Sequence, residues 1–163
     1  MVSAVGIIYI SVGLSLIFPL RAIMSNSFIG DIGYTIPLIL IVTIWINDTA
    51  AYLVGSLIGR RPLSPISPNK TWEGTIAGIL ISVLLVTKIM GQYIPLNERS
   101  IFLISMVAAI AGTFGDLLES KLKRLAGVKD SGAMMPGHGG FLDRFDSILL
   151  ATPFVWLLIQ LVY

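Results

Sequence analysis

The sequence contains no cysteine and a single histidine in 163 residues. The absence of cysteine excludes disulfides, thiolate metal sites and a catalytic thiol. Charged residues are also scarce, because they make up 12% of the chain, whereas a soluble domain carries about 25%. The chain is instead 55% hydrophobic, and its net charge is only +2. This composition indicates that a lipid bilayer is its solvent.

Five apolar runs are long enough to cross a membrane as helices, for which about 20 residues suffice. They cover approximately residues 2–20, 32–58, 75–94, 100–124 and 145–163, and Asn47, Asp48 and Thr49 interrupt the second. A soluble bundle of buried helices is disfavoured, because such runs leave almost no polar face for water. We therefore expect an all-α, polytopic membrane protein in which residues 1–163 form one membrane-embedded domain.

The loop cations predict the orientation of these spans. Eight of the eleven lysines and arginines lie in the last turn of the fourth run or in the loops after the second and fourth runs, and both loops lie on the same side of the membrane. Because cytoplasmic loops are enriched in lysine and arginine, we expect this side to be cytoplasmic. The N-terminus then starts inside and the C-terminus ends outside.

Two pairs of acids stand out against this apolar background. Asp116 and Glu119 are three residues apart on one helical face, and so are Asp143 and Asp146. Carboxylates within a membrane are costly and indicate function. Several converging carboxylates favour a hard cation such as Mg²⁺ or Mn²⁺. The alternative is that these acids form plain ion pairs with Lys121, Lys123, Arg124 and Arg144.

Asp48, in the second apolar run, and Asp116, in the fourth, are expected to lie at a similar depth in the bilayer. With a rise of about 1.5 Å per residue, Asp48 and Asp116 fall at comparable depth in the cytoplasmic half of the membrane. Polar groups at that depth need water, partners or an ion. We therefore expect a polar cavity open to the cytoplasm, walled by the second, fourth and fifth helices. The alternative for Asp48 is a polar packing contact with Asn47 and Thr49.

Two polar segments have the composition of phosphate sites. Pro136–Gly140 is a glycine-rich loop before a helix, flanked by Lys129 and Arg144, and such loops let backbone N–H groups approach phosphate oxygens. For His138, within this loop, the alternative to a role in phosphate binding is a purely structural hydrogen bond. The second segment is Ser67–Gly74, and the series Pro62, Pro65 and Pro68 holds its residues 67–71 in an extended connection.

The second segment offers Lys70 and Thr71 to a phosphate or a nucleotide. Glu73 is placed either to orient Lys70 or to interact with a helix start. The alternative is an ordinary capped helix start with no ligand.

At these residues the sequence resembles the phosphatidate cytidylyltransferases, also called CDP-diacylglycerol synthases. The resemblance rests on the signature in Ser120–Asp146, where Met135 is a mild departure, and on three further segments in the expected order: residues 47–52 (NDTAAY), 67–74 (SPNKTWEG) and 115–120 (GDLLES). It covers approximately residue 44 to the C-terminus. Members usually carry more N-terminal spans, so the resemblance implies a short or N-terminally truncated member.

The resemblance implies transfer of a cytidylyl group from CTP to phosphatidate at the inner membrane or its equivalent. It suggests Asp116, Asp143 and Asp146 as the carboxylates that hold Mg²⁺ or Mn²⁺, with a second cation possible. Lys129 and Arg144 complete the expected catalytic set. The expected substrate-binding residues are Asn47, Asp48, Lys70, Thr71, Glu73, Lys123, Arg124, His138, Gly139 and Gly140. The expected partners are the two substrates, the bilayer and a second copy of the chain, without nucleic acid.

Three other functions stay open at this point. A CTP-dependent kinase for a polyprenol- or phytol-type lipid alcohol would need a general base such as His138, and it would release CDP instead of pyrophosphate. A CDP-archaeol synthase-like enzyme would use the same headgroup chemistry on an ether lipid. A non-catalytic membrane protein would use the basic face to bind anionic lipid.

Overall fold

The computed structural model of the protein describes residues 2–22, 33–128, 143 and 145–162. Its elements in chain order are α1 (Val2–Ser15), α2 (Ile17–Ala22), α3 (Thr35–Ile58), β1 (Pro62–Ser64), β2 (Ser67–Thr71), α4 (Trp72–Tyr93), α5 (Glu98–Leu125) and α6 (Asp146–Val162). The expected helical architecture is confirmed, with one short hairpin between α3 and α4.

The helices correspond to the five predicted spans. Within the described residues, α3, α4 and α5 are long and apolar enough to cross a membrane, and Gly6–Ala22 and Asp146–Val162 are shorter apolar helical segments. The boundaries differ slightly, since α4 starts three residues before the prediction. There, the Thr71 side chain accepts a hydrogen bond of 3.2 Å from the Gly74 backbone N–H, which is a helix N-cap.

The polar interruption of the second run does not break its helix. Asn47, Asp48 and Thr49 lie within continuous α3. The Thr49 hydroxyl donates to the carbonyl of Trp45 at 2.8 Å, and Asn47 Nδ2 donates to Thr113 Oγ1 of α5 at 3.3 Å. These bonds satisfy Asn47 Nδ2 and the Thr49 hydroxyl without disturbing the helical backbone.

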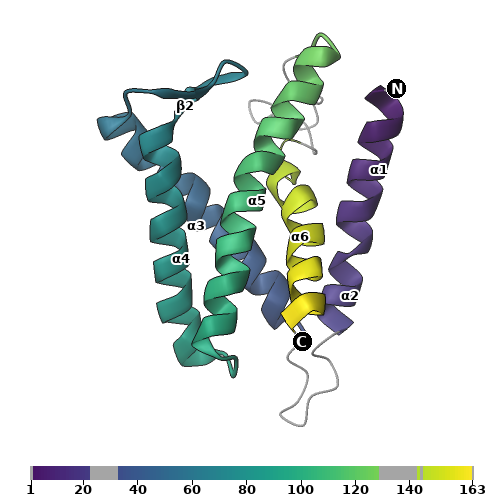
Figure 1. The fold of residues 1–163 in the computed structure, drawn as a ribbon, viewed down its shortest axis with the longest axis vertical. Helices are drawn as coiled ribbons and strands as arrows, with labels where there is room; N and C mark the ends of the chain where they lie inside the picture. The colour runs from purple at the N-terminus through teal and green to yellow at the C-terminus, as the bar shows by residue number, and fades with distance from the viewer. Residues whose placement is uncertain (1, 23–32, 129–142, 144, 163) are drawn as a thin grey trace.

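The helices form an upright bundle in which α5 lies between α4 and α6, while α3 crosses behind them and α1 stands beside α6 (Figure 1). The hairpin, the end of α5 and the N-terminus lie at one end of the bundle. The C-terminus and the α4–α5 connection lie at the other. The ends of α3 and α5, which precede the two cation-rich connections, thus lie at the same end of the bundle, as the charge pattern predicts.

Buried aliphatic side chains from α2, α3, α5 and α6 fill the centre of the bundle, among them Leu20, Ile36, Ile39, Ile101 and Val155. Helices α3 and α4 approach more closely than such side chains allow. A methyl group at Gly78 would lie 2.8 Å from the carbonyl oxygen of Asn47 and from Cβ of Ala51. Small residues at this crossing therefore hold α4 against the polar segment of α3.

The hairpin places the second polar segment over the bundle. Strands β1 and β2 are antiparallel, with Pro62 opposite Thr71 and Ser64 opposite Ser67. This pairing confirms the expected extended conformation of residues 67–71. The main-chain N–H of Trp72 also donates to the carbonyl of Arg61 at 3.0 Å, so the end of β2 stays tied to the beginning of the hairpin.

Candidate functional site: three carboxylates beside a polar cavity

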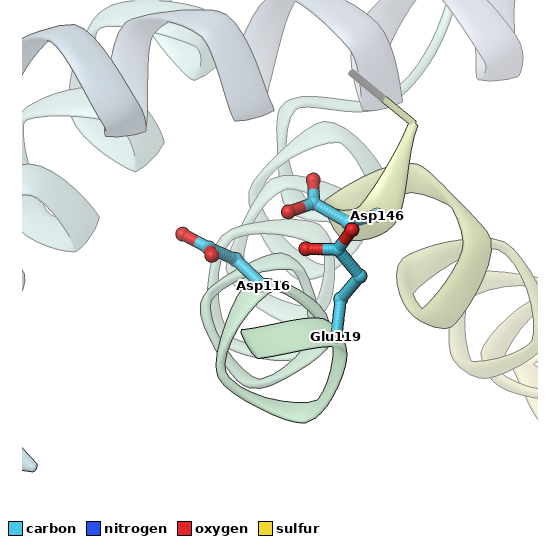
Figure 2. Close-up of side chains that lie close together, drawn as sticks. All are labelled: Asp116, Glu119 and Asp146. Atoms are coloured by element: carbon cyan, nitrogen blue, oxygen red, sulfur yellow. The ribbon is translucent and has the colours of Figure 1, made fainter. Parts of the chain in front are cut away.

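Helices α5 and α6 bring three carboxylates together (Figure 2). Asp116 and Glu119 share one face of α5, and Asp146 is the first residue of α6. One oxygen atom from each side chain lies within 4.8 Å of the other two. Glu119 is 1% exposed and Asp146 9% exposed, whereas the Asp116 side chain is 26% exposed. Asp116 is therefore the most accessible member of this acidic cluster.

Gly115 allows the two helices to approach closely enough to form the acidic cluster. A methyl group on its Cα would lie 2.7 Å from the main-chain oxygen of Asp146 and 3.1 Å from Cα of Ser147. A side chain at this position would push the start of α6 away from α5. The residue immediately before Asp116 therefore sets the separation between Asp116 and Asp146.

Two lysines neutralise part of the negative charge. The Lys70 ammonium, from β2, donates to Oδ2 of Asp116. Lys123 Nζ lies 2.7 Å from Glu119 Oε2 and 2.6 Å from Asp143 Oδ1. Asp116, Glu119 and Asp143 thus contact two ammonium groups, and Asp146 adds a fourth carboxylate, so this part of the described structure retains excess negative charge.

The acidic cluster fits a divalent cation. Glu119 Oε1 is buried and has no hydrogen-bonding partner within the described residues, an arrangement that is costly unless another group satisfies the oxygen. Carboxylate oxygens are the ligands that Mg²⁺ prefers, at about 2.1 Å, so two ligands of one ion lie at most about 4.2 Å apart. Neighbouring ligands in its octahedral geometry lie only about 3.0 Å apart, so the three side chains would move closer together when an ion binds. Asp116, Glu119 and Asp146 are therefore the residues that would hold such an ion.

A polar cavity of about 550 Å³ adjoins the acidic cluster and shares Asp116 with it. Its size is within the range of ligand pockets, about 300–1,000 Å³. The lining residues are Asn47, Asp48, Ala51, Tyr52, Gly55, Ser56, Ser67, Asn69, Lys70, Thr71, Thr75, Thr113 and Asp116. The second and fourth predicted helices line it as expected. The fifth contributes none of these residues, because α6 packs on α5 at Gly115, and the hairpin and the start of α4 take its place.

Among the described residues that line this cavity, Lys70 is the cation, and its side chain is 30% exposed. Burial lowers the pKa of Lys70 from its ordinary value, while the negative charges of Asp48 and Asp146 raise it. Glu73 lies in the first turn of α4, which is one of its two expected roles, and it also contacts the residues that precede the hairpin. Its Oε2 accepts hydrogen bonds from the main-chain N–H groups of Arg60 and Arg61, at 3.2 and 3.3 Å.

The structure brings several other predicted site residues to this region. Asn47, Asp48, Lys70 and Thr71 line the cavity, and Lys123 contacts the acidic cluster. Arg124 is exposed near the end of α5. Lys129, His138, Gly139, Gly140 and Arg144 lie outside the described residues.

Asp143 and Glu119 differ from the expected arrangement. Asp143, expected among the metal ligands, contacts Lys123 and lies outside the group of three, whereas Glu119 lies within it. The spacing of Asp116 and Glu119 had indicated a shared helical face. Asp143 remains connected to the acidic cluster through the ammonium group of Lys123.

Tyr9 of α1 contacts α6 in a way that the sequence does not reveal. Its hydroxyl donates a hydrogen bond to the main-chain oxygen of Asp146, at the first residue of α6. Helix α1 also packs against α6 at Gly13, where a methyl group would lie 2.5 Å from the carbonyl oxygen of Leu149. The first helix therefore helps to fix the position from which Asp146 reaches the acidic cluster.

Replacing Tyr9 by phenylalanine removes this hydrogen bond and keeps the ring. We expect a loss of about 1 kcal/mol in stability and weaker binding of Mn²⁺. Thermal unfolding in detergent and electron paramagnetic resonance of added Mn²⁺ measure the two effects. Tyr93→Phe, at an exposed tyrosine at the end of α4, is the matched control. Unchanged unfolding and Mn²⁺ binding in Tyr9→Phe would show that the hydroxyl contributes nothing.

The fold and site define a polytopic membrane protein with a carboxylate cluster beside a polar pocket. The model of the Cytidylyltransferase family matches residues 1–162, and the chain belongs to this family. It is similar to proteins named phosphatidate cytidylyltransferase. It is 48% identical to that of Bacillus subtilis (strain 168) over 123 residues, which is 74% of this chain and 45% of the relative.

Two further curated relatives have the same name. The chain is 47% identical to the protein of Staphylococcus epidermidis over 119 residues and 44% identical to that of Staphylococcus aureus (strain COL) over 119 residues. Each match covers 71% of this chain and 45% of the relative. The chain thus spans somewhat less than half the length of the curated relatives it matches.

Proposed function

We propose that the chain transfers a cytidylyl group from CTP to phosphatidate, which gives CDP-diacylglycerol and pyrophosphate for phospholipid synthesis. The printed names of its relatives and its place in the Cytidylyltransferase family support this activity. The observation that carries the proposal is the acidic cluster of Asp116, Glu119 and Asp146 at the edge of a cavity that holds Lys70.

The charges of the two substrates explain why this site suits the reaction. The phosphate of phosphatidate is a monoester with a second pKa of about 6, so it is largely ionised near neutral pH. One of its oxygens attacks the α-phosphorus of CTP, and the bond to the β-phosphate oxygen breaks to release pyrophosphate. This nucleophile needs no strong general base. It needs relief from anion–anion repulsion and alignment with the leaving group.

The residues divide these tasks. Asp116, Glu119 and Asp146 would hold a cation such as Mg²⁺ or Mn²⁺, which supplies charge neutralisation and orientation when bound. Lys70 contacts phosphate oxygens from the cavity, and Lys123 holds Glu119 and Asp143 in place. Lys129, Arg144 and the glycine-rich loop with His138 remain our candidates for further phosphate contacts.

The membrane setting of the proposal follows from the charge distribution. The hairpin and the end of α5 lie at one end of the bundle, and a cytoplasmic location of this end would give the site access to CTP. Phosphatidate would reach it from the same leaflet. Dimerisation, a second cation and the use of an ether lipid remain predictions that other experiments must test.

The deciding experiment uses purified protein, phosphatidate in detergent micelles and CTP labelled at the α-phosphate. We expect label in a lipid product and release of one pyrophosphate per product. Release of CDP with a phosphorylated lipid alcohol would instead identify a lipid kinase. Lipid binding without turnover in the presence of Mg²⁺ would favour a non-catalytic protein.

Removal of divalent cations is expected to abolish this activity. Without a cation, the uncompensated carboxylates repel both substrates, and loss of such electrostatic stabilisation reduces turnover by at least about a hundredfold. The measurement is pyrophosphate release in EDTA and after addition of excess Mg²⁺. An unrelated reaction that releases pyrophosphate without a metal is the control for the assay. Full activity in EDTA would rule out a cation held by the acidic cluster.

A further inference from the structure

Lys70 and Lys123 have different relations to the acidic cluster. Lys123 lies on α5 itself, is 18% exposed and contacts two carboxylates, those of Glu119 and Asp143. Lys70 comes from the hairpin, is 30% exposed and contacts Asp116, the most accessible acid of the cluster. Lys70 also lines the cavity, which Lys123 does not. Of these two cations, Lys70 is therefore the one that can leave its partner without stranding a buried charge.

We propose that Lys70 is an exchangeable counter-ion, which neutralises Asp116 until a divalent cation binds there and then contacts phosphate groups in the adjacent cavity. The contact of Lys70 with phosphate groups rests on the proposed function, whereas its exchange with the cation concerns only the protein and the cation.

The exchange follows from charge and from space. A divalent cation bound at Asp116 would bring a second positive group beside the Lys70 ammonium that contacts this carboxylate, so like-charge repulsion makes Lys70 compete with the cation. A displaced lysine remains beside the polar cavity, because its backbone is part of β2. There, Asp48 is a second nearby negative charge, which keeps the ammonium group within the cavity until an anionic ligand arrives.

The proposal predicts opposite effects of one substitution. Lys70→Met keeps the length of the side chain and removes the competing charge, so we expect about fivefold tighter binding of Mn²⁺ in the absence of nucleotide. The same variant should bind CTP in the presence of Mg²⁺ about tenfold more weakly, because a charged contact with phosphate is lost. Most damaging substitutions would weaken both.

Electron paramagnetic resonance measures Mn²⁺ binding, and equilibrium dialysis without phosphatidate measures CTP binding. Lys121→Met is the matched control, because Lys121 is an exposed lysine on α5, and it should leave both affinities unchanged. Equal or weaker Mn²⁺ binding by Lys70→Met would overturn the exchange. Tighter Mn²⁺ binding with unchanged CTP binding would overturn the phosphate contact.

A second measurement uses the unmodified protein and does not depend on the folding of a variant. Pulsed acetylation followed by peptide mass spectrometry reports how available each lysine is. We expect labelling of Lys70 to rise severalfold when Mg²⁺ replaces K⁺ at constant ionic strength, while labelling of Lys121 stays constant. Constant labelling of Lys70 would contradict the exchange. Neither metal experiment involves turnover, so failure of the proposed enzymatic activity would be seen separately, as absence of pyrophosphate release.

Discussion

Asp146→Asn is expected to remove Mn²⁺ binding and to lower turnover by about a hundredfold to a thousandfold, while the protein stays folded. Asp146 lies at the start of α6 and offers one of the three clustered carboxylate oxygens. Its Oδ1 accepts two hydrogen bonds from Ser147, one from the main-chain N–H at 2.6 Å and one from the hydroxyl at 3.2 Å. Asparagine keeps the shape and can keep these hydrogen bonds, but it loses the negative charge. Mn²⁺ titration, pyrophosphate release and thermal unfolding separate the three consequences.

Two comparisons sharpen this prediction. Glu98→Gln removes a carboxylate that is exposed at the opposite end of α5, and it should leave both Mn²⁺ binding and turnover unchanged. Asp143→Asn removes the partner of Lys123 without removing a member of the acidic cluster, so we expect it to reduce turnover and to retain Mn²⁺ binding. Loss of Mn²⁺ binding in Asp143→Asn, with retention in Asp146→Asn, would show that the cation is held by Asp143 and not by Asp146.

Gly115→Ala is expected to destabilise the protein by about 1–3 kcal/mol through overpacking and to weaken Mn²⁺ binding at the same time. The added methyl group would lie 2.7 Å from the main-chain oxygen of Asp146 and 3.0 Å from Cβ of Leu150. Since main-chain atoms cannot yield as a side chain does, α6 must move away from α5. That movement separates Asp146 from Asp116 without altering either carboxylate.

Gly6→Ala provides the matched control for this substitution. Gly6 lies in α1, and among the described residues no atom outside its own stretch of helix lies within 4 Å of where its methyl carbon would be. The same chemical change should therefore be neutral there, or slightly stabilising through the higher helix propensity of alanine. Wild-type stability and wild-type Mn²⁺ affinity in Gly115→Ala would show that the α5–α6 crossing tolerates a side chain and does not set the site.

The membrane-spanning helices could be predicted because hydropathy acts along the chain. The run that became α3 and the run that became α5 are both long and apolar, and each forms one helix. The shared face of Asp116 and Glu119 could be predicted for the same reason, since helical geometry fixes the relation of residues three apart. The family signature identified the segments that contain most of the site.

The choice of partners between helices could not be predicted in this way. Which acid joins Asp116 and Glu119 depends on how α6 packs against α5, and that packing depends on Gly115 and Ser147 making close contact. Asp143 and Asp146 look equivalent by spacing, but one faces Lys123 and the other faces the acidic cluster. The contact of Tyr9 with Asp146 joins residues 137 positions apart, and a single tyrosine in an apolar run gives no signal of it.

The anchoring of the hairpin has a kinetic consequence. Glu73 accepts hydrogen bonds from the main-chain N–H groups of Arg60 and Arg61, and the N–H of Trp72 donates to the carbonyl of Arg61, so the end of the strand that carries Lys70 is tied to the beginning of the hairpin. Rotation of a partly exposed side chain takes picoseconds to nanoseconds, whereas collective closure of a lid takes microseconds to milliseconds. Rearrangement of Lys70 would therefore equilibrate far faster than typical turnover, and the slow step of a catalytic cycle at this site would lie elsewhere, in bond formation or in departure of the lipid product.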